Sequence, residues 1–72
     1  MSVNKPLQMY ADIVPDSVWM HVNGNKYRVL VIANVETERP VEYPPTVVYQ
    51  NIDNGKVYSR LRSDWYRSMT KV

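Results

Sequence analysis

The side chains most suited to recognising a partner are tyrosines and arginines in the last quarter of the chain. Tyr58 and Arg60 are two residues apart in a β-prone segment, so both project from the same face of a strand. A helical turn after this strand would bring Arg62, Tyr66 and Arg67 close to them. Guanidinium groups beside phenol rings can bind carboxylates, phosphates or stacked bases. These five residues are the predicted partner-binding site.

Residue types that support catalysis or metal binding are scarce. His21 is the only histidine and the chain has no cysteine, whereas a metal site needs three or four converging ligands. His21 flanks an expected hairpin and is expected to face solvent, which does not suit a nucleophile–base pair. Glu36, Glu38 and Glu42 lie in a polar, proline-rich loop that offers little of the burial paired catalytic carboxylates require. We predict no catalytic residue, no metal site, no cofactor and no enzymatic activity.

The aromatic composition and the charge distribution both favour an interface. The chain has six tyrosines, two tryptophans and no phenylalanine, and the polar ends of Tyr and Trp seek water or a partner. Trp19, Tyr27, Tyr49 and Trp65 are expected to fill the core. The net charge is only +2, but the segment after Gly55 is basic. Such a segment can attract an anionic partner or can be an ordinary solvated surface.

Four β-prone segments are separated by turn signals, at residues 18–22, 26–33, 46–52 and 56–61. Asn23-Gly24 predicts a two-residue type I′ turn between the first two segments, in which both residues have positive φ. Gly55 ends a second hairpin loop. The second segment is apolar on both faces over residues 29–33, which predicts a strand buried on both sides.

The remaining segments connect or extend these hairpins. Residues 34–45 form a polar loop whose prolines cannot join central strand pairing. Ser63 could cap a short helical turn, after which the chain adds a last strand or frays. We predict one mainly β domain over residues 18–72, a small SH3-like, strongly bent antiparallel barrel of four or five strands with a short helical turn near the C-terminus. Residues 1–17 are expected to form an N-terminal arm or a short helix.

Several short stretches resemble the bacterial and phage domain-of-unknown-function 1653 family. They are Asn23-Gly24-Asn25-Lys26-Tyr27-Arg28-Val29-Leu30, Glu36-Thr37-Glu38, Val47-Val48-Tyr49-Gln50 and Val57-Tyr58-Ser59-Arg60-Leu61. They follow the order of that family over roughly residues 18–66, although Tyr58 stands where the family usually has tryptophan. The resemblance implies an SH3-like barrel and a phage accessory protein in the cytoplasm of an infected bacterium. It implies no established activity.

These observations favour a non-enzymatic protein-binding module that docks on a host protein with an acidic surface and modulates or inhibits it. The alternative is a nucleic-acid-binding barrel that uses the same basic, aromatic segment. A net charge of +2 is low for that alternative. A homodimer is also possible for so short a chain. No apolar run is long enough to cross a bilayer, and the lack of cysteine favours a reducing, cytoplasmic location.

Overall fold

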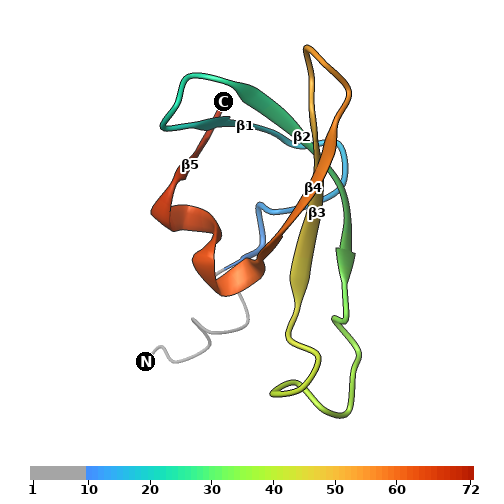
Figure 1. The fold of residues 1–72 in the computed structure, drawn as a ribbon. Coiled ribbons are helices and arrows are strands. Elements are labelled where there is room, and N and C mark those ends of the chain that lie inside the picture. Colours follow the sequence, from blue (N-terminus) through green and yellow to red (C-terminus); the bar gives the residue numbers. More distant parts are fainter. Residues whose placement is uncertain (1–9) are drawn as a thin grey trace.

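The computed structural model describes residues 10–72, which form five antiparallel strands in one sheet (Figure 1). The strands are β1 (Val18–His21), β2 (Lys26–Ala33), β3 (Thr46–Asn51), β4 (Val57–Leu61) and β5 (Met69–Lys71), in the order β4-β3-β2-β1-β5. A 3-10 helix, η1 (Arg62–Arg67), connects β4 to β5. The predicted mainly β fold with a helical turn near the C-terminus is confirmed.

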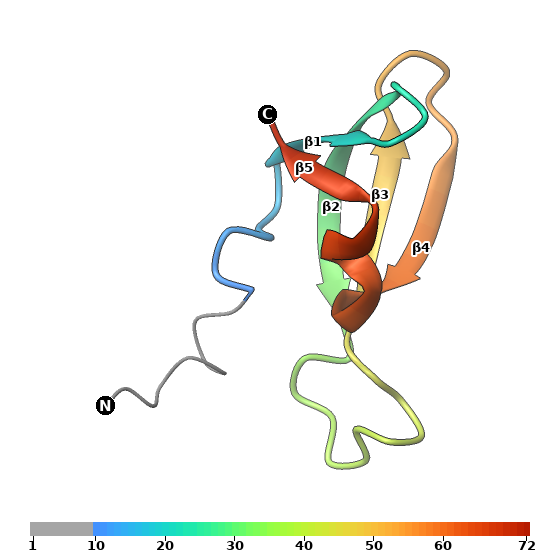
Figure 2. The ribbon, with the colours of Figure 1, turned by 90° about the vertical axis from the view of Figure 1, so that its left-hand side faces the viewer.

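The sheet bends so that its two edge strands approach each other without pairing. β1 and β5 cross over the layer formed by β2, β3 and β4, and η1 occupies the gap between β4 and β5 (Figures 1 and 2). The start of β2 is shared between two partners, because Tyr27 pairs with Trp19 of β1 and with Asn51 of β3. A register shift between Val29 and Val31 marks a β-bulge, which bends a strand and increases its twist. The result is a partly open barrel.

The two hairpin turns place glycine where a left-handed backbone is required. Gly24 has φ +92° and Gly55 has φ +76°, a region that residues with a Cβ rarely adopt. The type I′ prediction for the first turn is wrong, because Asn23 does not have a positive φ. Instead the chain turns over His21 to Gly24, with the Gly24 N–H donating to the His21 carbonyl at 2.8 Å.

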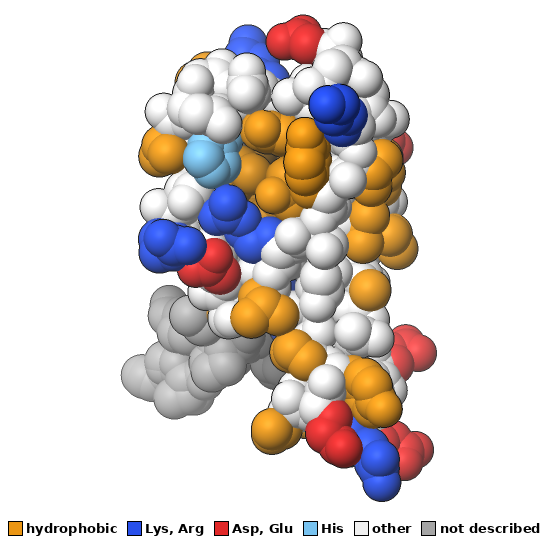
Figure 3. All heavy atoms as spheres, viewed as in Figure 1, with side chains coloured by type: hydrophobic (Ala, Val, Ile, Leu, Met, Phe, Trp, Pro, Cys, Tyr) orange, Lys and Arg blue, Asp and Glu red, His pale blue; other side chains and the backbone are white. Residues whose placement is uncertain are grey.

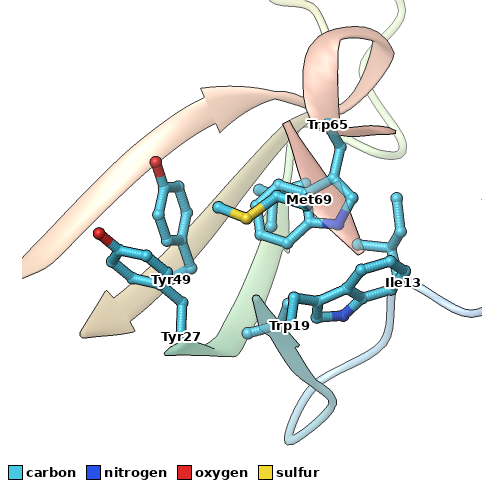
Figure 4. Close-up of a cluster of buried hydrophobic side chains, with 8 residues drawn as sticks. Ile13, Trp19, Tyr27, Tyr49, Trp65 and Met69 are labelled. Carbon is cyan, nitrogen blue, oxygen red and sulfur yellow. The ribbon is translucent and has the colours of Figure 1, made fainter. Parts of the chain in front are cut away.

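The core lies inside the bend and is largely aromatic (Figure 4). Trp19, Tyr27, Tyr49 and Trp65 are all buried, as predicted. The Trp65 ring packs edge-on against both Trp19 and Tyr49, with ring centroids 5.7 and 5.1 Å apart. Edge-to-face packing of this kind adds roughly 0.5–1.5 kcal/mol per pair beyond the burial of apolar area. The remaining buried apolar side chains are Ile13, Val29, Val47 and Met69.

Burial on both faces of β2 was a wrong prediction. Leu30 and Val31 are exposed, Val31 by 49%. The sheet is a single layer at this point, and Val31 pairs with Val48 on the convex side, facing away from the core. No described residue buries this side of β2. The apolar residues 30 and 31 therefore lie on the surface, next to the β-bulge.

The segments around the strands differ from expectation in two further details. Ser63 does not cap the helical turn, because η1 begins at Arg62 and Ser63 lies inside it. The first N–H of η1, that of Arg62, donates to the Pro45 carbonyl at 3.0 Å. Over residues 10–17 the backbone forms turns and not a helix, and the buried side chain there is Ile13. The rest of the predicted arm or helix, residues 1–9, lies outside the described residues.

Candidate functional site

Tyr58 and Arg60 lie on the inner face of β4. They pair across the ladder with Tyr49 and Val47, which are both buried, so the prediction that they share one face is confirmed. The inner face of the barrel has two ends of different character. The closed end is formed by the buried side chains Ile13, Trp19, Trp65 and Met69. The open end is formed by His21, Tyr27, Tyr49, Tyr58 and Arg60.

The three tyrosine rings of the open end contact one another. The Tyr27 and Tyr49 rings meet edge-on at 5.2 Å, and the Tyr58 ring lies 6.2 and 5.9 Å from them. Tyr58 is the outermost ring, with 42% of its surface exposed. The hydroxyl groups of Tyr27 and Tyr49 point away from the tryptophans (Figure 4). Within residues 10–72, none of these three hydroxyls makes a hydrogen bond.

Arg60 reaches from β4 across the opening to β1. Its Nη2 lies 3.4 Å from Nε2 of His21, and only 18% of the arginine side chain is exposed. Its Nη1 is buried and has no hydrogen-bond partner in the described part of the chain. The His21 ring packs edge-on against Tyr27 at 6.2 Å. Figure 3 shows hydrophobic side chains gathered in a hollow beside this histidine, with basic side chains along its border.

Asp64, in η1, is the acidic group nearest to this arginine. Its Oδ2 lies 3.7 Å from Arg60 Nη1, which is an ion pair without a hydrogen bond. Arg67 donates two hydrogen bonds to the same carboxylate, at 2.6 and 3.0 Å. The hydrogen bond from Arg67 and the positive charges of both arginines lower the pKa of Asp64. Asp64 therefore stays charged, but its carboxylate is hydrogen-bonded by Arg67 and not by Arg60.

The other two predicted site residues belong to a separate cluster on the far side of η1. Arg62 lies over the Tyr10 ring, 4.4 Å from its centroid. Tyr66 stacks on Tyr10 at 6.0 Å, contacts Trp19 and donates a hydrogen bond to the Asp12 carboxylate. The predicted patch thus divides in two. Tyr58 and Arg60 lie at the open end with Arg67 beside them, whereas Arg62 and Tyr66 attach the N-terminal segment to the barrel.

Three members of the open end, His21, Tyr27 and Tyr49, are absent from the predicted partner-binding site. His21 was expected to face solvent but is half-buried on the inner face. Tyr27 and Tyr49 are buried, as predicted, and their rings also contact Tyr58. The signal that could have found them is strand pairing. Tyr49 lies directly opposite Tyr58, so a surface containing one of these side chains must contain the edge of the other.

The open end is made of arginine, histidine and tyrosine side chains, and arginine and tyrosine are residue types that are enriched at interfaces. Across residues 10–72, no group of three or more His, Cys, Asp or Glu side chains could hold a metal ion. No helix in that part of the chain is long and apolar enough to cross a membrane. Family models, curated proteins and solved structures were all compared with the chain, and none matches it.

Proposed function

We propose that the chain is a non-enzymatic protein-binding module whose open end binds an acidic surface of a partner protein. One observation carries the proposal. A recessed guanidinium and three tyrosine hydroxyls share one opening of the barrel, and none of these groups hydrogen-bonds to an acceptor oxygen within the described residues. Rigid tyrosines around a central arginine are the residue types that dominate binding energy at protein interfaces. The family resemblance adds that the partner is a bacterial host protein, which the module modulates or inhibits.

The charge distribution supports a protein partner over nucleic acid. Affinity for nucleic acid depends on several cations that are free to neutralise phosphates. Here Arg67 is hydrogen-bonded to Asp64, and Arg60 is recessed beside the same carboxylate. Arg62 is engaged with the Tyr10 ring. The C-terminal arginines are therefore less available to a phosphate backbone than the sequence alone suggests.

The proposal is tested by affinity capture from a bacterial lysate, followed by a binding titration with the captured protein. The informative variant is Tyr58→Ala combined with Arg60→Ala. The matched control is Arg28→Ala, which removes the same charge from the convex face, where Arg28 pairs with Gln50. We expect stoichiometric capture by the wild type and the control, and at least a tenfold loss of affinity in the double variant.

Circular dichroism must first show that both variants fold, so that lost binding is not lost structure. Capture of no stoichiometric protein, or equal capture by the double variant, would overturn the proposal. Salt-sensitive binding to an oligonucleotide in place of a protein would favour the nucleic-acid alternative.

A further inference from the structure

We propose that His21 and Arg60 together form a binding site for one carboxylate of the partner protein. This inference deepens the proposed function and rests on it. It assigns the centre of the open end to a pair of donors from β1 and β4, 39 residues apart in the sequence. The three tyrosines form the walls around this pair. The ligand is an aspartate or glutamate side chain, or a C-terminal carboxylate.

Both ring nitrogens of His21 lie against groups that carry N–H bonds. Nδ1 faces the backbone N–H of Asn23 at 3.0 Å, and that N–H can only donate. Nδ1 is therefore the acceptor, and the proton of the neutral ring is on Nε2. Nε2 faces Nη2 of Arg60, which also can only donate. Two donors thus face each other at 3.4 Å.

Exchanging the tautomer does not remove the conflict. If Nε2 accepted from Arg60, then Nδ1 would carry the proton and would face the Asn23 N–H. A neutral imidazole has one donor and one acceptor, and both of its neighbours here are donors. One donor is left without an acceptor in either arrangement. Unpaired donors in a partly buried setting cost free energy, so the pair favours a ligand that brings acceptor oxygens.

No described residue supplies that acceptor. Asp64 is the nearest carboxylate to Arg60, but it lies 3.7 Å from Nη1 and is hydrogen-bonded by Arg67. Nη1 itself makes no hydrogen bond. The positive charge of Arg60 is therefore only partly balanced within the molecule. A second carboxylate approaching Nη2 and Nε2 would satisfy both facing donors at once.

The shape of the site favours a carboxylate over other ligands. The three tyrosine rings pack against one another at 5.2 to 6.2 Å, so they leave no aromatic cage for a cation between them. The guanidinium is recessed, with 18% of its side chain exposed, which suits a small planar group on a flexible stem. Guanidinium and carboxylate are matched planar partners that form charge-assisted hydrogen bonds.

The test uses His21 as its own reporter, because the only histidine of the chain gives ring signals that need no assignment. The full-length protein is titrated with sodium acetate and followed by the His21 ring signals in nuclear magnetic resonance spectra, at constant pH and ionic strength. We expect a saturable shift, with the two ring-nitrogen signals reporting a proton on Nε2. Parallel titrations use sodium chloride, inorganic phosphate, an acetylated peptide with an internal glutamate and an amide-capped peptide without acidic residues.

Two variants sharpen the result. Arg60→Lys keeps the charge but loses the planar fork, and we expect it to weaken acetate binding at least about tenfold. Arg28→Lys, on the convex face, is the matched control and should leave binding within about twofold. Phosphate binding tighter than acetate would overturn the carboxylate assignment, and so would a shift that does not saturate or that persists unchanged in Arg60→Lys.

Failure of this inference is distinguishable from failure of the proposed function. If a protein partner is captured through Tyr58 and Arg60 but acetate and the glutamate peptide do not bind, the carboxylate site is wrong and the binding module stands. If acetate binds as described but no protein is captured, the carboxylate chemistry stands and the protein-binding function is wrong.

Discussion

Both ends of the barrel interior are built around aromatic rings, yet only one of them is sealed. At the closed end, η1 and the N-terminal segment bring Trp65 and Ile13 over Trp19, and all three are at most 3% exposed. At the open end, Tyr58 is the single aromatic ring of β4, and 42% of its surface is exposed. The rings are in contact from one end to the other, because Tyr49 touches both Trp65 and Tyr58.

Under the proposed function, the difference lets so short a chain combine a stable core with a surface for binding. The closed end supplies the burial that a domain of 72 residues needs, and a domain of this size has little to spare. The Tyr49 ring packs against Trp65 of the closed end, and on the proposed function this contact would position the side chains of the open end before a partner binds. Preorganisation of this kind lowers the entropic cost of association.

The largest expected effect is on the closed end. Trp65→Ala removes a fully buried ring, and such substitutions cost about 3–5 kcal/mol, comparable to the whole stability of a small domain. We expect the variant to be largely unfolded in the absence of denaturant, by circular dichroism and urea titration. A cooperative transition close to that of the wild type would contradict the division into two ends.

At the open end, Tyr58→Ala is expected to lower the free energy of unfolding by about 1–2 kcal/mol, because the Tyr58 ring is only partly buried, with 42% exposure. The variant should remain folded but lose partner binding, whereas Trp65→Ala should lose the fold itself. The same urea titration, followed by a binding titration, checks both. A loss of stability equal to that of Trp65→Ala would show that the open end is part of the core.

Features of the fold and of the site could be predicted from the sequence where they depend on residues close together in the chain. Alternation and turn residues placed the strands and the four core aromatics, because both signals act over a few residues. Alternation also put Tyr58 with Arg60 on one face. It could not bring His21 to Arg60, a contact set by the bend of the sheet. Nor could composition show that Asp64 would engage Arg67, or that Arg62 would lie over Tyr10.

A smaller effect concerns Tyr66, which attaches the N-terminal segment to the closed end. Partial burial, and then the hydrogen bond to Asp12, raise the pKa of Tyr66 above its ordinary value. The folded state holds this proton more tightly, so the stabilisation is complete below the ordinary tyrosine pKa of about 10 and is lost as the pH rises through the raised value. We expect the free energy of unfolding to decline above about pH 10, and to decline less steeply in Tyr66→Phe. Equal slopes in urea titrations of the two proteins would contradict this assignment.

The smallest effect is expected on the convex face. Val57 and Leu61 are 53% and 44% exposed, so Val57→Thr with Leu61→Thr should change stability by no more than about 0.5 kcal/mol per site. We expect light scattering to give the same monomer mass for the wild type and this variant. A wild-type dimer that dissociates in the variant would instead assign the exposed Val57 and Leu61 side chains to self-association and leave the open end for the partner.

The most direct test of the central claim is to map the partner's footprint on this chain by nuclear magnetic resonance. The backbone and side-chain signals of the labelled protein are compared with and without the captured partner or its acidic segment. We predict that the largest changes fall on His21, Tyr58 and Arg60, while the indole signal of Trp65 is nearly unchanged. Changes centred on Leu30, Val31 and the rest of the convex face would contradict the account.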